Sequence, residues 1–179
     1  MAFGGFALRF GFLLLGVFRR LLVGLGLFLR GRGVALGLFL GLLLRQLVVL
    51  RSLLGIALGL SGRFEEAVST LEKAAEMSGR HSLALTGLAG VFGQTGSLAN
   101  AFALHRELMD RATRDYVSPT HLALTAEAAG DRDEAMAFAR RAWDEREPSF
   151  ILWARHFPQY RTLQTDPRFV AILREMNEP

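Results

Sequence analysis

The amino-acid sequence predicts an all-α fold: an antiparallel helix-pair solenoid of about three repeats, with a C-terminal capping helix and a hydrophobic helical segment at the N-terminus. Two observations predict it. Within residues 62–74, "GRFEEAVSTLEKA", the apolar residues recur with the 3.6-residue period of an amphipathic helix. Glycine, alanine and other apolar residues also recur every 34 positions over about a hundred residues, which is typical of stacked helical repeats.

The repeat is visible in four columns of residues. The first two are Gly62, Gly96, Gly130 and Ala67, Ala101, Ala135; the others are Leu58, Phe92, Ala126 and Ala74, Leu108, Ala142. The glycine is expected to end the first helix of each pair in a left-handed or tight turn. The alanine at the start of the second helix allows the two helices to approach closely, while the larger residues fill the space between layers.

These columns set the predicted boundaries of the helices. The repeats are residues 48–81, 82–115 and 116–149. The first helices are expected at about 49–60, 83–94 and 118–129, and the second helices at about 64–77, 98–111 and 132–145. Ser118 is a candidate N-cap, followed by Pro119 at the first helical position.

Residues 150–179 differ from the repeats and are expected to form a capping segment. Pro158 should end one short helix, and Asp166 with Pro167 should begin another at about 167–177. The apolar face of that last helix would contain Phe169, Ile172, Leu173 and Met176. A terminal repeat needs such a cover over its open apolar face, so Trp153, Phe157, Tyr160 and Phe169 are expected to pack as core residues.

Residues 1–47 are rich in Gly, Leu, Phe and Arg, and three interpretations remain open. Residues 1–60 hold seven arginines and no Asp, Glu or Lys, whereas residues 61–179 carry a net charge of −3. The N-terminal part is a membrane-associated segment, a further helical layer, or a stretch that is not natural structure because of a wrong start or frame. The best membrane-spanning window, 33–50, includes Arg45, and the many glycines argue against one unbroken helix. Residues 1–47 are expected to be dispensable for folding of 48–179.

The 34-residue period, with a helix on each side of a glycine turn, resembles the tetratricopeptide repeat (TPR). The segments "YVSPTHLAL", "AGDRDEAMAFARRAWDEREP" and "FPQYRTLQTDPRFVAIL" resemble the C-terminal TPR region of large bacterial regulatory proteins. Those proteins carry a kinase, cyclase or winged-helix DNA-binding domain upstream. The resemblance implies a role in signalling or regulation. It also leaves an alternative function, a C-terminal fragment of a signalling enzyme or transcription regulator whose active domain is missing.

The sequence offers no catalytic, cofactor-binding or metal-binding pattern. The glycines of "GLAGVFGQTG" lack the lysine and the preceding strand of a phosphate loop. The four histidines have no metal-ligand spacing, and the chain has no cysteine. His105 is expected to be a partly buried packing residue. The high pI belongs to the N-terminus alone, so no nucleic-acid partner is expected.

The prediction is therefore a non-enzymatic scaffold that binds a protein or peptide, without cofactor. The resemblance implies that the partner lies on the concave face formed by the first helices of the pairs. By column, the candidate contacts are Ser52, Thr86, Gln94, Thr120, His121, Leu124 and Glu127. The expected location is the cytoplasm. Association with the inner face of a bacterial membrane through residues 1–47 is left open.

Overall fold

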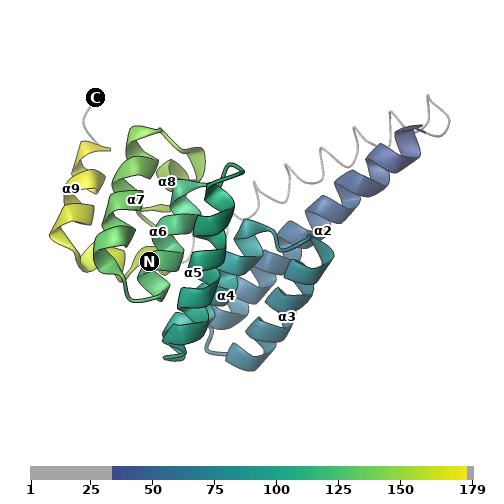
Figure 1. Ribbon diagram of the computed structural model, residues 1–179, viewed down its shortest axis with the longest axis horizontal. Helices are drawn as coiled ribbons and strands as arrows, with labels where there is room; N and C mark the ends of the chain where they lie inside the picture. Colours follow the sequence, from purple (N-terminus) through teal and green to yellow (C-terminus); the bar gives the residue numbers. More distant parts are fainter. Residues whose placement is uncertain (1–33, 177–179) are drawn as a thin grey trace. The chain divides into compact units, whose positions relative to one another are not determined.

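The structure is a computed structural model that describes residues 34–176. Within these residues the fold is all-α, as predicted: eight α-helices and two short 3₁₀ helices occur, without a strand. The chain divides into two compact units, residues 1–50 and residues 51–179 (Figure 1). Predictions that concern residues 1–33 lie outside the described residues.

Helix α2 (Val34–Leu60) is the first described element, and it belongs to both units. The sequence predicted a hydrophobic helical segment at the N-terminus and the first helix of the repeats from about residue 49, and its many glycines argued against one unbroken helix over residues 1–47. In the structure residues 34–48 are helical and continuous with residues 49–60, since α2 continues through Gly37 and Gly41. Each helical glycine costs about 1 kcal/mol relative to alanine, but leucine is among the better helix formers, and leucines surround both glycines.

Five helices follow in the second unit, and each of their ends lies within one residue of its predicted position. They are α3 (Phe64–Met77), α4 (Ser82–Gln94), α5 (Leu98–Ala112), α6 (Pro119–Ala128) and α7 (Arg132–Asp144). The predicted left-handed glycines are confirmed: φ is +81° at Gly62, +78° at Gly96 and +87° at Gly130. A residue with a β-carbon is strained in this conformation, which explains why the column is glycine.

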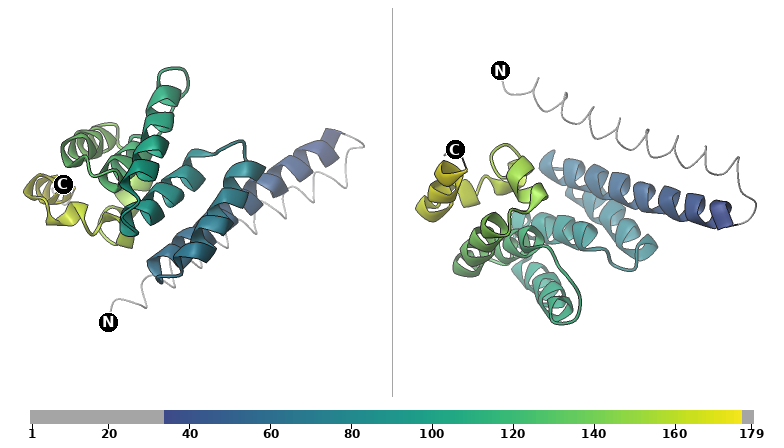
Figure 2. Two further views of the ribbon diagram at one scale, coloured as in Figure 1. Left: turned by 60° about the horizontal axis from the view of Figure 1, so that its bottom comes forward. Right: turned by 90° about the horizontal axis from the view of Figure 1, so that it is seen from above.

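The helices of the second unit pack in a regular order. Helix α4 contacts α3, α5 and α6, and α6 in turn contacts α5 and α7 (Figures 1 and 2). The alanine column is fully buried, since Ala67, Ala101 and Ala135 are all 0% exposed. Small residues therefore lie where the helices are closest.

Glycines on α2 and α4 leave room for side chains and backbone atoms of neighbouring helices. The Leu71 side chain of α3 lies against both Gly55 of α2 and Gly87 of α4. A β-carbon at Gly93 would lie only 2.9 Å from the carbonyl oxygen of Ala128 on α6. The glycine-rich run of α4 therefore permits close packing.

The C-terminal segment consists of α8 (Pro148–Trp153), two 3₁₀ turns, η1 (Pro158–Tyr160) and η2 (Leu163–Thr165), and α9 (Pro167–Glu175). Asp166 caps α9 as predicted, since its carboxylate accepts a hydrogen bond of 2.9 Å from the backbone N–H of Arg168. Phe150 makes edge contacts with Tyr160 and Phe169, at ring distances of 6.1 and 5.9 Å.

The four aromatic residues predicted as core differ in burial. Tyr160 and Phe169 are buried, at 1% and 0% exposed, so the prediction is confirmed for them. Trp153 and Phe157 are only partly buried, and their rings lie 5.6 Å apart. Tyr160 and Phe169 belong to the second hydrophobic cluster, and the partly buried Trp153 and Phe157 pack against it.

Candidate functional site

Three of the seven residues predicted to contact a partner are not accessible. Ser52, Thr86 and Thr120 are 0%, 2% and 4% exposed. The Thr86 hydroxyl donates a hydrogen bond of 2.8 Å to the carbonyl of Ser82, one turn earlier in its own helix. The Thr120 hydroxyl donates to the carboxylate of Glu147. All three side chains are buried in the structure, and Thr86 and Thr120 form internal hydrogen bonds; their contact with a partner stays a prediction.

The other four candidates keep some contact with solvent. Gln94 is exposed at the C-terminal end of α4, and His121, Leu124 and Glu127 on α6 are partly buried. The carboxylate of Glu127 forms an ion pair of 3.0 Å with Arg132. Because Gly93 packs on Ala128, Gln94 and Glu127 lie near each other at the same ends of α4 and α6.

The C-terminal segment of the chain lies on this same face. Gly90 is one turn from Thr86 and one turn from Gln94, so the three share one side of α4. A β-carbon at Gly90 would lie 3.5 Å from the amide nitrogen of Gln159. The sequence predicted a cover for the end of the stack and missed that part of it reaches α4.

Two aromatic residues of this segment reach the helices beside it. The Tyr160 hydroxyl is hydrogen-bonded to Thr120 on α6, and burial, together with the charge of Glu147, raises the pKa of Tyr160. Phe157 packs against both hydrophobic clusters of the second unit. We call Phe157–Tyr160, the residues that lie against α4 and α6, the inner segment.

A buried carboxylate holds the start of α6. Glu147, which is 9% exposed, accepts hydrogen bonds from the hydroxyls of Ser118, Thr120 and Ser149 and from the backbone N–H of Thr120 at 3.0 Å. Burial raises the pKa of Glu147, but these donors together outweigh it and the pKa lies below its usual value. Ser118 does occupy the N-cap position, but its hydroxyl makes no cap. Instead, Glu147, which lies 29 residues after Ser118 in the sequence, caps the helix by accepting the hydrogen bond from the backbone N–H of Thr120.

His121 lies next to this cluster. Its Nδ1 is buried without a hydrogen-bond partner among the described residues. Burial lowers the pKa of His121 to about 4; the Glu147 charge opposes this shift and His81 adds to it. The imidazole is therefore neutral at neutral pH.

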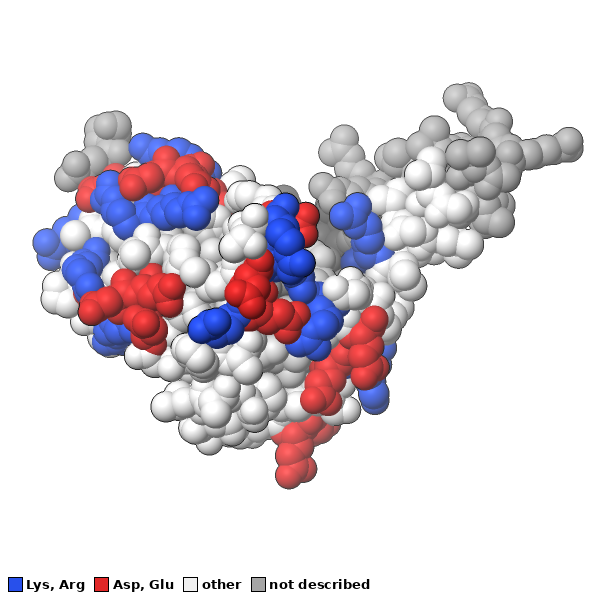
Figure 3. Space-filling view, viewed as in Figure 1, with Lys and Arg blue, Asp and Glu red and all other residues white. Residues whose placement is uncertain are grey.

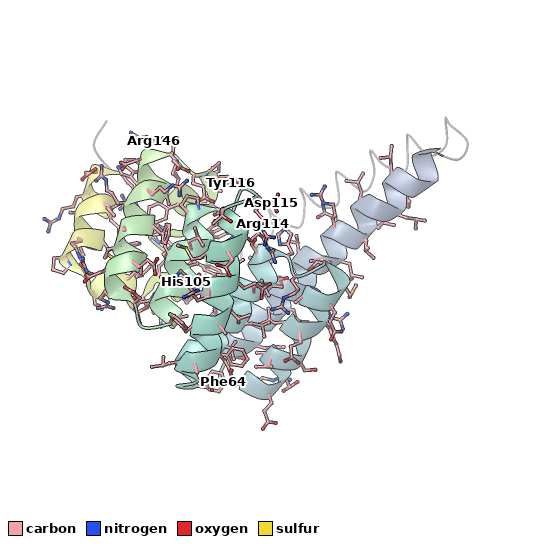
Figure 4. All side chains as sticks on the ribbon, in the orientation of Figure 1. Phe64, His105, Arg114, Asp115, Tyr116 and Arg146 are labelled. Carbon is pink, nitrogen blue, oxygen red and sulfur yellow. The ribbon has the colours of Figure 1, made fainter. Side chains whose placement is uncertain are left out.

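His105 is the centre of a second polar cluster (Figure 4). It is 2% exposed, and its Nδ1 lies 2.9 Å from the Thr125 hydroxyl while its Nε2 lies 3.0 Å from the carboxylate of Glu134. These three side chains come from α5, α6 and α7, so the cluster connects three helices. The sequence predicted a packing histidine, which is confirmed. It missed both polar partners, because they come from other helices.

The outer surface of the second unit carries interleaved charges (Figure 3). Arg80 and Arg111 both bind the carboxylate of Glu107, at 2.6 and 3.1 Å. Arg140 binds Glu175 at 2.7 Å, which connects α7 to α9. Such partly exposed pairs contribute little each, about 0–1 kcal/mol.

Within residues 34–176, no three His, Asp or Glu side chains are grouped as a metal would require. The four donors to Glu147 saturate its oxygens, so this carboxylate serves the fold. No protein-family model matches the chain, and neither does any curated protein or solved structure. The site is therefore interpreted from its own geometry.

Proposed function

We propose that the chain is a non-enzymatic protein-interaction scaffold built as a TPR-like solenoid. Its repeats would be residues 48–81, 82–115 and 116–149, capped by 150–179. The proposal is supported by the 34-residue columns, whose glycines all have positive φ and whose alanines are all fully buried. Stacked helix pairs of this kind use extended concave surfaces for binding.

The ligand class we propose is a peptide or short helix held on α4 and α6. One observation carries this proposal: the same face already holds the inner segment of the chain itself. Gln159 lies over Gly90, and Tyr160 is bound to Thr120. A surface that accommodates aromatic rings and an amide from its own chain has the shape and chemistry to accept a similar segment from a partner.

The open part of this face is the end formed by Gln94 and Glu127. Gln94 is exposed and uncharged, and Glu127 keeps a partly exposed carboxylate next to Arg132. We propose that the partner contacts these two residues and the partly buried Leu124 on α6. Thr86 and Thr120, on the same two helices, are buried and form hydrogen bonds within the protein.

Site-specific photo-crosslinking in cells tests this proposal. A benzophenone side chain is introduced at Gln94, and a matched control is introduced at Asn100, an exposed polar residue on α5. We expect a discrete crosslinked adduct at Gln94 and none at Asn100, with the adduct reduced by Leu124→Asp. Equal adducts at both positions, or an adduct unaffected by Leu124→Asp, would argue against a partner on this face.

A further inference from the structure

The described residues of the first unit form a largely apolar helix with exposed leucines on opposite sides. Leu38, Leu40 and Leu44 are 66%, 55% and 51% exposed, and Leu42 and Leu47 are also exposed. At 100° per residue, Leu38 and Leu40 lie on nearly opposite sides of the helix. A helix that is apolar all round needs an apolar environment, either a protein core or lipid.

The charged residues of this part of the sequence are all basic. Residues 1–60 contain seven arginines and no acidic residue, and Arg45 is exposed in the middle of the leucines. An acidic protein surface would supply opposite charge but not an apolar layer around the whole helix. A bilayer with anionic headgroups supplies both, because arginine side chains extend to the headgroups while the leucines enter the acyl chains.

The second half of α2 limits how the helix can enter lipid. By length and composition, Gly37–Leu60 could cross a membrane, a test that core helices also pass. Residues 51–60, however, are part of the second unit. Ser52 and Ile56 are 0% and 4% exposed, Gly55 lies against Leu71, and a β-carbon at Gly59 would lie 2.8 Å from Val91. Placing residues 51–60 in lipid would separate them from Leu71 and Val91 and would open the hydrophobic core of the second unit.

The remaining helical stretch is too short to span. Residues 34–50 give a helix of about 26 Å at 1.5 Å per residue. The hydrocarbon core is about 30 Å thick, and a span needs about 20 apolar residues. The window also includes Arg45.

We propose that residues 34–50 dock on an anionic lipid bilayer as a non-spanning anchor, and that α2 leaves the lipid at Arg51. This interaction is independent of the partner proposed for α4 and α6. It makes the chain a scaffold that presents its repeats at a membrane surface.

Cysteine labelling of the full chain tests the proposal, since the natural sequence contains no cysteine. Leu40→Cys and Leu54→Cys form a matched pair, because both leucines are 55% exposed on the same helix. Each variant is labelled with a polarity-sensitive fluorophore and mixed with vesicles of phosphatidylcholine alone or of equal parts phosphatidylcholine and phosphatidylglycerol. Flotation of the vesicles separates bound protein from aggregates.

We expect the label at position 40 to shift to the blue with the anionic vesicles, and the label at position 54 to stay unchanged. Arg45→Gln should raise the lipid concentration for half-binding about fivefold, the equivalent of about 1 kcal/mol per arginine near the surface. Blue shifts at both positions would show that Gly37–Leu60 enters lipid as a whole, and would overturn the proposal. A shift at neither position, or equal binding to neutral vesicles, would overturn it as well.

Discussion

The fully buried alanines of the 34-residue column are the residues most sensitive to size. Ala101 is 0% exposed on α5, whereas Ala103, two residues later, is exposed. Ala101→Leu should lower the free energy of unfolding by about 1–3 kcal/mol, because added methylene groups overpack the core. Ala103→Leu should change it by less than about 0.5 kcal/mol. Urea unfolding measures both, and equal losses would show that the buried face of α5 is assigned wrongly.

His121 should make stability depend on pH. Its folded-state pKa of about 4 lies below the ordinary value of 6.5, so the unfolded chain takes up the proton first as the pH falls. The contribution of His121 to the free energy of unfolding is complete above about pH 6.5, and it is lost as the pH falls toward about 4. Between about pH 7 and about pH 5, the loss from this group should be on the order of 1–2 kcal/mol.

Urea unfolding at several pH values checks this prediction. His121→Gln should flatten the decrease below neutral pH. His156→Gln, which removes an exposed imidazole, serves as the matched control and should keep the wild-type slope. If the two variants behave alike, His121 is not the buried neutral imidazole described above.

Single polar residues were the part of the site that the sequence predicted least well. His105 was expected to pack, since it shares a column with leucine and alanine, and it is buried. Its partners Thr125 and Glu134, and the role of Glu147 as the cap of α6, come from residues 20 to 29 positions away. A periodic pattern shows which face of a helix is apolar. It does not show which polar side chain from another helix will meet it.

At the scale of helices, two glycines of α4 should respond in opposite ways to alanine. A β-carbon at Gly93 would lie 2.9 Å from a backbone oxygen of α6, and backbone atoms cannot move aside easily. At Gly90 the nearest atom, on Gln159, would lie at an ordinary 3.5 Å.

Gly93→Ala should therefore destabilise the fold by about 1–3 kcal/mol through overpacking. Gly90→Ala should be neutral or stabilise it by up to about 1 kcal/mol, because alanine favours the helix. Thermal unfolding of the two variants decides this. A stable Gly93→Ala variant would mean that α4 and α6 are further apart than described.

The helix boundaries of the second unit could be predicted because turn glycines and apolar periodicity coincide there. Helix α3 occupies residues 64–77, as expected from the stretch after Gly62. The start of α2 could not be predicted, because its leucines and glycines have no polar face and no capping residue near residue 34. The inner segment was also missed, since its contacts with α4 and α6 depend on the path of the chain after Pro158.

At the scale of the whole molecule, the chain consists of two units with different chemistry. Residues 1–50 contain most of the exposed leucines of α2, and residues 51–179 contain the buried alanine columns, the polar clusters and the ion pairs described above. We predict that residues 48–179 fold as an independent module and that residues 1–47 serve another purpose.

The most direct test is urea unfolding of the full chain and of residues 48–179, followed by circular dichroism at the helical minimum. We predict that the truncated protein is soluble and mainly helical, and that it unfolds in one cooperative transition with the midpoint of the second unit in the full chain. A truncated protein that aggregates, or that unfolds without a cooperative transition while the full chain stays folded, would contradict the claim. It would show that residues 1–47 are part of the repeat fold.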